Sequence, residues 1–400
     1  MTLRRNLRVL RHRLRYRAGR AFRPRQLLAT LTLIVAMAVA VGLLLLVVSE
    51  NAVNTSGTTA TPPPSTQPKT TTPKTTTPKT TTPKTTTPKT TTPKASTPKT
   101  TTPTTKPVGQ TVPLGVYAGP GSPVAATAFS ADAGAPVTYA FDYLDGSSWQ
   151  TIADPIWFVQ RWSGSGFRMI WGVPMLPTTG ATLAAGATGQ YDAYFSQLAY
   201  TLVANGQADS VIMLGWDPEG STLPWAVSTA AEAADYVAYW RQIVTTMRSV
   251  SGEQFQFAWD TAPGSAPTLI PALYPGNAYV DIVATDAFDV GATAVDSGWD
   301  ALAEAPYGPD WFATFAAEHK KPFMIAKWGL APTTQSGGGD NPTFVSQFLR
   351  WADHEHLFAA VTWDYGSWAV TGGDFPKSAA MLHSVAEAGD FAPIAKAVDT

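Results

Sequence analysis

From residue 112 onward, the chain alternates short apolar runs with longer stretches in which apolar residues recur at helical spacing. The apolar runs predict eight strands, at Leu114–Tyr117, Thr138–Phe141, Met169–Gly172, Ser210–Gly215, Gln254–Trp259, Val280–Thr285, Phe323–Ala326 and Ala359–Trp363. The stretches between them predict helices, notably at Tyr191–Ala204, Ala230–Val250, Asp310–His319, Thr343–His354 and Ser378–Ala388. Because strands that alternate with helices pair in parallel, eight such units predict an α/β fold, a closed (β/α)8 TIM barrel.

An open, doubly wound sheet is the alternative fold for the same order of elements. Such sheets usually bind a nucleotide at a glycine-rich turn after the first strand. Here the first strand is followed by Ala118-Gly119-Pro120-Gly121-Ser122, which lacks the required glycine spacing and contains a proline. The barrel is therefore the favoured prediction, and no nucleotide cofactor is expected.

An uncharged apolar run at 27–48 predicts a transmembrane helix. Its 22 residues would extend about 33 Å, enough to cross the hydrocarbon core of a bilayer. Residues 1–26 hold ten arginines and no acid, so this segment should stay cytoplasmic. A cleaved signal peptide is the competing interpretation, but the run is longer than a usual signal core and its small-x-small triplets lie inside it. The arginine flank argues against a buried helix of a soluble core.

We therefore expect a single-pass signal-anchor in the plasma membrane, with everything after it on the extracellular, cell-envelope side. Residues 49–110 form a Thr/Pro/Lys segment in which Pro-Lys-Thr-Thr-Thr repeats from Pro68 onward. Such a composition predicts a disordered linker, able to extend on the order of 150 Å as polyproline II. Its lysines could pair with anionic wall polymers or could only keep the spacer soluble. The barrel is expected at 111–391.

The expected barrel is acidic. Residues 110–400 hold 10 Lys and Arg against 28 Asp and Glu, although the whole chain is close to neutral. Phosphate binding needs clustered cations, so a nucleic-acid partner is not expected. The chain has no cysteine, and its core must be stable without disulfides. We expect a monomer.

Carboxylates and aromatic residues follow the predicted strands, where a barrel places its reactive groups. The candidate substrate-binding residues are Tyr117, Asp142, Trp171, Trp216, Trp259, Asp260, Asp286, Trp328 and Trp363. Carboxylates accept hydrogen bonds from sugar hydroxyls, and indole rings stack on the apolar faces of pyranoses. Any single tryptophan could instead pack between helices and barrel. Together the set predicts a polysaccharide ligand.

A series of short motifs, in sequence order, resembles glycoside hydrolase family 26, a group that contains β-mannanases. These motifs are Leu114-Gly115-Val116-Tyr117, Gly189-Gln190-Tyr191-Asp192, Leu214-Gly215-Trp216, Tyr274-Pro275-Gly276 with Tyr279-Val280-Asp281-Ile282, His319-Lys320-Lys321-Pro322, Trp328-Gly329 and Gly338-Gly339-Asp340-Asn341-Pro342. The resemblance implies a clan A barrel with a retaining mechanism. It also implies an acid/base Glu after the fourth strand and a nucleophile Glu after the seventh, with carboxyl groups about 5–5.5 Å apart.

Both catalytic positions depart from the family pattern. Where the family reads Trp-Glu-x-Asn-Gly, this chain reads Trp216-Asp217-Pro218-Glu219-Gly220, so the acid is shorter and a second acid lies two residues on. Lys327 occupies the nucleophile position, and an ammonium cannot form a glycosyl ester. The candidate catalytic residues are Asp217, Glu219 and an inactive Lys327. We expect Lys327 to pair with Asp217, Glu219 or Asp286.

Four functions remain open on these residues. The favoured one is a carbohydrate-binding domain without turnover. The second is a glycoside hydrolase of altered, for example inverting, mechanism that uses Asp217 or Glu219 with Asp286 or Asp260. The others are a structural module of the cell envelope and an enzyme in which Lys327 forms a Schiff base.

Metal chemistry is not expected. His354 and His356 are two residues apart and would face different directions on a helix. Asp340-Asn341 could line the cleft, but the following helical pattern favours a capping role. No metal or other cofactor is predicted.

Overall fold

A computed structural model describes residues 112–219, 222–262, 269–290 and 298–388. The predicted cytoplasmic segment, the transmembrane helix at 27–48 and the linker at 49–110 all lie outside these residues. Within the described ranges, no helix is long and apolar enough to cross a membrane. Membrane anchoring therefore stays a prediction from the sequence.

Eight parallel strands close into a barrel in chain order, with β8 hydrogen-bonded to β1. They are β1 Leu114–Tyr117, β2 Val137–Tyr143, β3 Arg168–Val173, β4 Val211–Leu214, β5 Gln256–Thr261, β6 Ile282–Asp289, β7 Phe323–Leu330 and β8 Ala360–Trp363. The predicted (β/α)8 barrel is confirmed. Several strands run further than their apolar runs indicate, and β6 and β7 extend the most, to Asp289 and Leu330. Asp286 and Lys327 thus lie inside strands.

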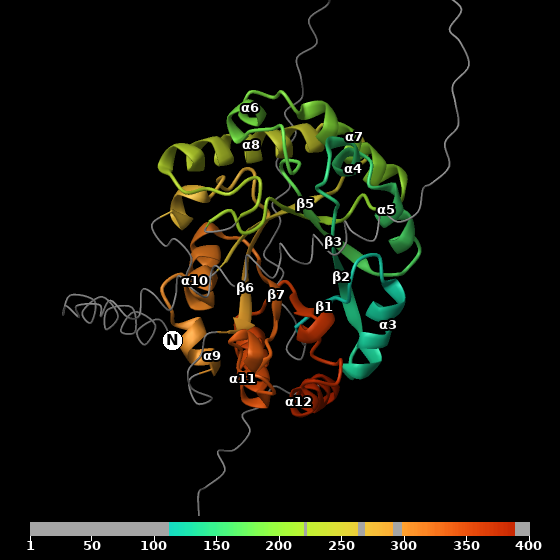
Figure 1. The fold of residues 1–400 in the computed structure, drawn as a ribbon, viewed down its shortest axis with the longest axis vertical. Coiled ribbons are helices and arrows are strands. Elements are labelled where there is room, and N and C mark those ends of the chain that lie inside the picture. The colour runs from blue at the N-terminus through green and yellow to red at the C-terminus, as the bar shows by residue number, and fades with distance from the viewer. Residues whose placement is uncertain (1–111, 220–221, 263–268, 291–297, 389–400) are drawn as a thin grey trace, which may run out of the picture. The chain divides into compact units, whose positions relative to one another are not determined.

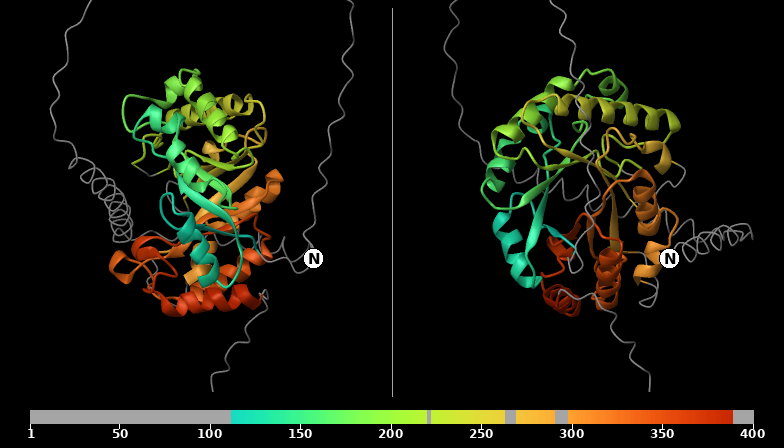
Figure 2. Two further views of the ribbon diagram at one scale, coloured as in Figure 1. Left: turned by 90° about the vertical axis from the view of Figure 1, so that its right-hand side faces the viewer. Right: turned by 180° about the vertical axis from the view of Figure 1, so that it is seen from behind.

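Helices surround the barrel (Figures 1 and 2). They are α3 Pro123–Asp132, α4 Trp149–Ala153, α5 Ile156–Trp162, α6 Leu183–Ala187, α7 Asp192–Ala204, α8 Ala230–Arg248, α9 Gly298–Ala303, α10 Pro309–His319, α11 Pro342–His354 and α12 Pro376–Ala388. Short 3-10 turns are η1 Ile270–Leu273, η2 Thr333–Gln335 and η3 Gly366–Trp368. Capping explains several starts: Thr229 and Glu232 form a capping box on α8. The Asn341 side chain accepts from Phe344 N at the start of α11, as predicted.

The apolar core has two layers, separated by the barrel wall. Inward-facing residues such as Phe141, Ile170 and Met213 fill the barrel interior, whereas their strand neighbours pack outward against the helices. This alternation follows from the two-residue period of a strand. The side of the wall that a residue faces therefore decides whether it can reach the open end of the barrel.

A bulge between β6 and β7 breaks this alternation at one place. Thr285 pairs with Ile325, but the next residue, Asp286, pairs with Lys327, so that Ala326 is extra. Ala326 belongs to the barrel interior, and Trp328 packs on the helix side. Because a bulge adds one residue to a strand, Ala326 and Lys327 both face inward. The bulge thus turns Lys327 into the barrel interior, on the strand next to Asp286.

Candidate functional site

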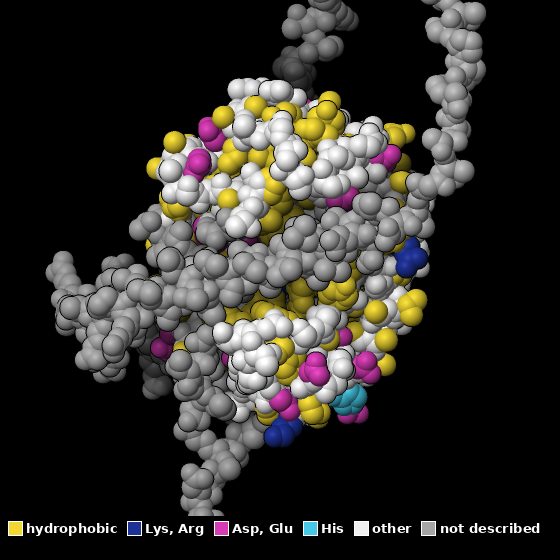
Figure 3. All heavy atoms as spheres, viewed as in Figure 1, with side chains coloured by type: hydrophobic (Ala, Val, Ile, Leu, Met, Phe, Trp, Pro, Cys, Tyr) yellow, Lys and Arg dark blue, Asp and Glu magenta, His cyan; other side chains and the backbone are white. Residues whose placement is uncertain are grey.

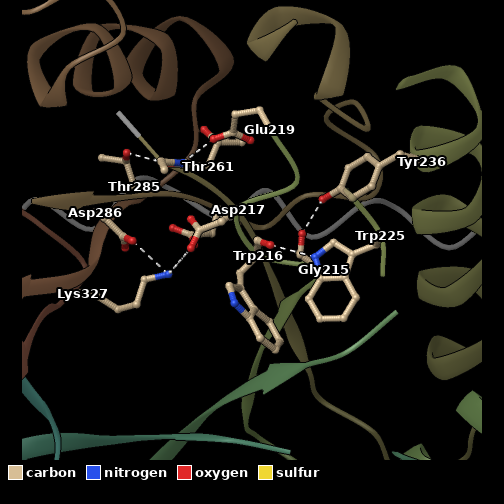
Figure 4. Close-up of polar contacts among 12 residues, drawn as sticks. Gly215, Trp216, Asp217, Glu219, Trp225, Tyr236, Thr261, Thr285, Asp286 and Lys327 are labelled. Carbon is tan, nitrogen blue, oxygen red and sulfur yellow. Dashed lines mark hydrogen bonds and ion pairs between the residues drawn. The ribbon is translucent and has the colours of Figure 1, made fainter. Parts of the chain in front are cut away.

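The Lys327 ammonium lies among three carboxylates, of which Figure 4 labels Asp217 and Asp286. Its Nζ is 3.0 Å from Asp286 Oδ2, 3.1 Å from Asp260 Oδ2 and 3.3 Å from Asp217 Oδ2. We call these four residues the carboxylate cluster. The expected pairing of Lys327 with Asp217 and Asp286 is confirmed, and Asp260 is an additional partner. Only 4% of the Lys327 side chain is exposed, whereas 26% of Asp217 is, so a ligand reaches the cluster from the Asp217 side.

Asp217 is held in place by the turn that follows β4. Three successive carbonyl groups of this turn accept hydrogen bonds from aromatic side chains: Leu214 from Trp240, Gly215 from Tyr236 and Trp216 from Trp225, at 2.8–3.0 Å. Figure 4 shows the last two. The turn uses left-handed backbone at Gly215 (φ 58°) and at Asp217 (φ 46°), the latter uncommon outside glycine. A turn fixed at three carbonyls leaves Asp217 little freedom to move, as binding and catalytic groups require.

Glu219 lies beside the cluster but has its own contacts. It is almost completely buried, and its Oε1 accepts a hydrogen bond from the backbone N–H of Ala262, just after β5. Burial, and secondarily the charge of Asp217, raises the pKa of the Glu219 carboxyl well above its usual value. Folding therefore favours the protonated form of this carboxyl, which is the form that a general acid needs.

Burial and charge act against each other on the cluster. Burial alone would lower the pKa of Lys327, but the three carboxylates outweigh it and hold this pKa well above its ordinary value. Burial raises the pKa of Asp260 to about 6 and that of Asp286 well above its usual range, and the ammonium opposes both shifts. Lys327 thus stays charged near neutral pH, and a charged ammonium has no lone pair with which to form a Schiff base.

Four aromatic side chains lie next to the cluster at the open end of the barrel. Tyr143 is 4.7 Å from Trp216 and 5.6 Å from Tyr117 between ring centroids, and Tyr117 is 4.5 Å from Trp363. We call Tyr117, Tyr143, Trp216 and Trp363 the aromatic collar. Tyr143 is electrostatically coupled to Lys327, Asp286 and Asp217, yet it is absent from the sequence-based candidates. Strand alternation identifies it, because Tyr143 faces inward with Phe141.

Three predicted stacking residues are corrected by the structure. Trp171, Trp259 and Trp328 are fully buried between the barrel wall and the helices, and none can stack on a sugar there. For Trp171 and Trp259 the reason is alternation, since their neighbours Ile170 and Ala258 face inward. For Trp328 the reason is the bulge. Of the tryptophans chosen from sequence, Trp216 and Trp363 alone belong to the collar.

Asp142 is also corrected, because it faces the helices. Its Oδ2 accepts from the backbone N–H of Gly121 and from Trp162 Nε1, each at 2.7 Å. Asp142 therefore anchors the loop after β1 to α5. Asp340 has a comparable structural role, since it accepts from the backbone N–H groups of Lys377 and Ser378 at the start of α12.

The buried Asp142 gives a pH-dependent stability prediction. Burial raises its pKa from 3.8 to about 6, so folding favours the protonated form. Its contribution to stability is complete below pH 3.8 and is lost as the pH rises through about 6. We expect Asp142→Asn, whatever its absolute stability, to flatten the fall of the unfolding free energy across this window, by roughly 3 kcal/mol. Urea unfolding at several pH values measures the slope. An unchanged slope contradicts the prediction, and the exposed Asp145→Asn is the control.

The only cluster of possible metal ligands among the described residues is Asp217, Asp260 and Asp286, whose oxygens lie within 4.8 Å of one another. The Lys327 ammonium occupies the space between these oxygens and already supplies the positive charge. The residues present therefore do not fit a metal ion in this arrangement.

No protein-family model and no curated protein sequence matches the chain. Solved structures do share its fold. One is a modular endo-β-1,4-mannanase of glycoside hydrolase family 26 from Cellulomonas fimi, which is 18% identical, with a TM-score of 0.51 over 69% of this chain and 71% of that chain. Another is GH26C from a Muricauda species, which is 12% identical, with a TM-score of 0.51 over 72% and 91% of the two chains.

Sequence identities this low establish a shared fold and leave activity to be argued from the site itself. The barrel of this chain has the fold of the family 26 glycoside hydrolases, in agreement with the resemblance of its sequence motifs.

Proposed function

We propose that the chain is a membrane-anchored, extracellular domain that binds a β-linked polysaccharide on a glycoside hydrolase barrel and does not cleave it. The observation that carries the proposal is the Lys327 ammonium, which lies 3.0–3.3 Å from all three carboxylates of the cluster. Retaining hydrolysis needs a carboxylate at that place to attack the anomeric carbon. An ammonium cannot do so.

The charge of Lys327 also opposes the transition state. Glycoside cleavage passes through an oxocarbenium-like state, which a carboxylate stabilises and a nearby cation destabilises. Because Asp217, Asp260 and Asp286 are each paired with this ammonium, one unit of their negative charge is offset, and each carboxylate stabilises a positively charged sugar less than it would alone. The ammonium also fills the space that an inverting mechanism would need for water between these carboxylates.

Binding, by contrast, needs only what the open end of the barrel still provides. The partly exposed Trp216 and Trp363 of the aromatic collar offer ring faces for stacking, and the partly exposed Asp217 can accept hydrogen bonds from sugar hydroxyls. The acidic character of the barrel disfavours an anionic polymer: the face drawn in Figure 3 has acidic side chains at several places and few basic ones. A neutral polysaccharide such as a β-1,4-mannan or β-glucan fits this charge.

The anchoring part of the proposal is supported by sequence alone. The uncharged run at 27–48 follows ten arginines and precedes the Thr/Pro/Lys repeats. A linker of that length would present the barrel to wall polysaccharide on the order of 150 Å from the bilayer. A membrane anchor keeps a binding domain at the cell surface, whereas a hydrolase can act after it has been released from the cell.

A second function, hydrolysis by an altered mechanism, is favoured by Glu219. This carboxyl is buried, and its burial favours the protonated form that a general acid needs. The mechanism would pair it with Asp217, Asp260 or Asp286 as the base. It would also require Lys327 to leave the cluster when substrate binds, so that water could enter.

Two assays on the purified full chain separate these functions. We expect binding to β-1,4-mannan or β-glucan, measured by affinity electrophoresis, and no release of reducing sugar above the blank. Release by the wild type would contradict the loss of turnover. In that case Glu219→Gln should lower the rate about 10²–10⁴-fold, whereas Glu318→Gln on the exposed face of α10 should not. If the full chain neither binds β-1,4-mannan and β-glucan nor releases reducing sugar from them, the carbohydrate proposal is overturned.

A further inference from the structure

A pocket of about 300 Å³ lies on the rim of the barrel, outside the carboxylate cluster. Its lining includes Asp145 from the loop after β2, Thr151 and Asp154 around α4, and Ile156, Trp157 and Phe158 at the start of α5. We call it the rim pocket. It combines apolar rings with carboxylates and a hydroxyl group, the mixture that small-molecule and sugar sites use.

Trp157 is half exposed, at 54%, but it is not loosely placed. A Cβ atom on Gly121 would lie 2.7 Å from the Trp157 ring, so the indole packs directly on the glycine backbone. Phe158 contacts it edge-on at 4.8 Å, and the Arg161 guanidinium lies 5.4 Å from its centroid. A side chain already fixed in one position loses little entropy when a ligand stacks on it.

The loop after β1 connects Trp157 to the aromatic collar. Gly119, with φ 97°, has the Tyr365 ring 2.7 Å from where its Cβ would be. Gly121, with φ 56°, has Trp157 at the same distance, so the two exposed rings flank this short loop. The Tyr365 ring is in turn 5.7 Å from that of Tyr117 in the collar.

The same loop is held rigidly from inside. Asp142 Oδ2 accepts from Gly121 N at 2.7 Å, and Arg161 Nε donates to Gly121 O at 3.0 Å. Glycine is required here because a side chain at either position would strain the left-handed backbone and collide with the ring. Tyr365, the loop and Trp157 therefore form one fixed strip from the collar to the rim pocket.

We propose that the rim pocket is a second sugar subsite, in which Trp157 stacks on a residue of the same neutral polysaccharide that occupies the barrel opening. This inference rests on the proposed glycan binding. Asp145 and Asp154 line the pocket, whereas Arg161 lies beside Trp157 outside the lining and donates to the Gly121 carbonyl, so the charge of the lining disfavours anionic ligands. Asp145 accepts from Ser147 N and Ser147 Oγ and keeps further acceptor capacity for sugar hydroxyls. The strip gives a long chain a continuous path between the two places.

The test compares ligand lengths on the full chain and on Trp157→Ala. The probes are the disaccharide β-1,4-mannobiose and soluble β-1,4-mannan, with β-1,4-glucan of matched lengths in parallel. We expect Trp157→Ala to weaken binding of the polymer roughly threefold to tenfold and to leave that of the disaccharide unchanged. Trp157→Phe, which keeps an aromatic face, should retain most of the affinity. The matched control is Tyr200→Ala, which removes a 63% exposed ring from α7. It should change neither the affinity for the polymer nor the affinity for the disaccharide.

Each outcome decides between the two proposals. Equal polymer binding by the wild type and Trp157→Ala overturns the rim subsite and leaves glycan binding intact. Loss of polymer and disaccharide binding in the same proportion also overturns it, since the effect would then come from the barrel opening. Failure of the wild type to bind any probe overturns the proposed function, and the subsite with it. Thermal unfolding of each variant shows whether a weakened one is still folded.

Discussion

Replacement of Lys327 by methionine is expected to lower the free energy of unfolding at neutral pH by about 3–5 kcal/mol. Methionine has nearly the length of lysine but carries no charge. Three buried or partly buried carboxylates would then face one another without a cation. Breaking a buried ion pair by removing one partner leaves uncompensated charge, and this costs more than the intact pair contributes.

The loss of stability in Lys327→Met should increase as the pH rises. Burial already raises the pKa values of Asp260 and Asp286, and without the ammonium that opposes these shifts they rise further. Raised carboxyl pKa values in the folded state favour folding at low pH, and this contribution disappears as the pH rises through them. The difference between variant and wild type should therefore be small near pH 4 and large near pH 7.

Chemical denaturation at these two pH values measures the effect. Lys327→Met combined with Asp260→Asn and Asp286→Asn removes the repulsion and should recover most of the loss. Lys321→Met is a matched control, since Lys321 donates only to the Asn277 carbonyl at the surface; its effect should stay within about 0.5 kcal/mol. Equal stability of Lys327→Met and the wild type at neutral pH would show that the ammonium does not hold the cluster together.

The second large effect is a gain of hydrolysis in Asp217→Glu/Lys327→Glu. These changes restore the two glutamates that the family pattern implies, on a turn and a strand that the structure holds in place. We expect reducing-sugar release from β-1,4-mannan or β-glucan to exceed the wild-type background by about 10²-fold or more. The physical reason is that a carboxylate can attack the anomeric carbon and stabilise the developing positive charge.

The charge of the cluster must be controlled in this experiment. The double variant carries one more carboxylate than the wild type and no ammonium, so addition of Asp260→Asn restores the original number of carboxylates. Lys327→Gln removes the cation without supplying a nucleophile and should stay inactive. If Lys327→Gln releases as much reducing sugar as the double variant, the cation rather than the missing nucleophile suppresses turnover. If all variants are folded, bind glycan and remain inactive, the barrel opening is not competent for retaining hydrolysis.

The apolar pattern determined the fold well. Every strand run marks a strand of the barrel, and the helix at Asp310–His319 differs from α10 by one residue. The reason is that strand and helix periods are local properties, read from neighbouring residues. The sequence pattern did not identify short elements such as α4 or α6, whose five residues are too few to show a period.

The sequence also pointed to the centre of the site. Asp217, Asp260, Asp286 and Lys327 all lie at strand ends or late in strands, and a parallel barrel brings those places together whatever its details. Their opposite charges predicted the pairing of Lys327 with Asp217 and Asp286. The identity of the cluster could thus be predicted, although Asp260 was expected to bind substrate rather than Lys327.

Tertiary structure alone decided which neighbours of these residues face the opening. Trp328 directly follows Lys327, yet it packs against the helices, because an extra residue in β7 shifts its pairing with β6. Asp142 adjoins the inward-facing Tyr143 but anchors a loop on the other side of the wall. The types of residue at the strand ends, and so the chemistry, were determined by the sequence. Their orientation was decided by pairing register and packing between distant segments, which no local pattern records.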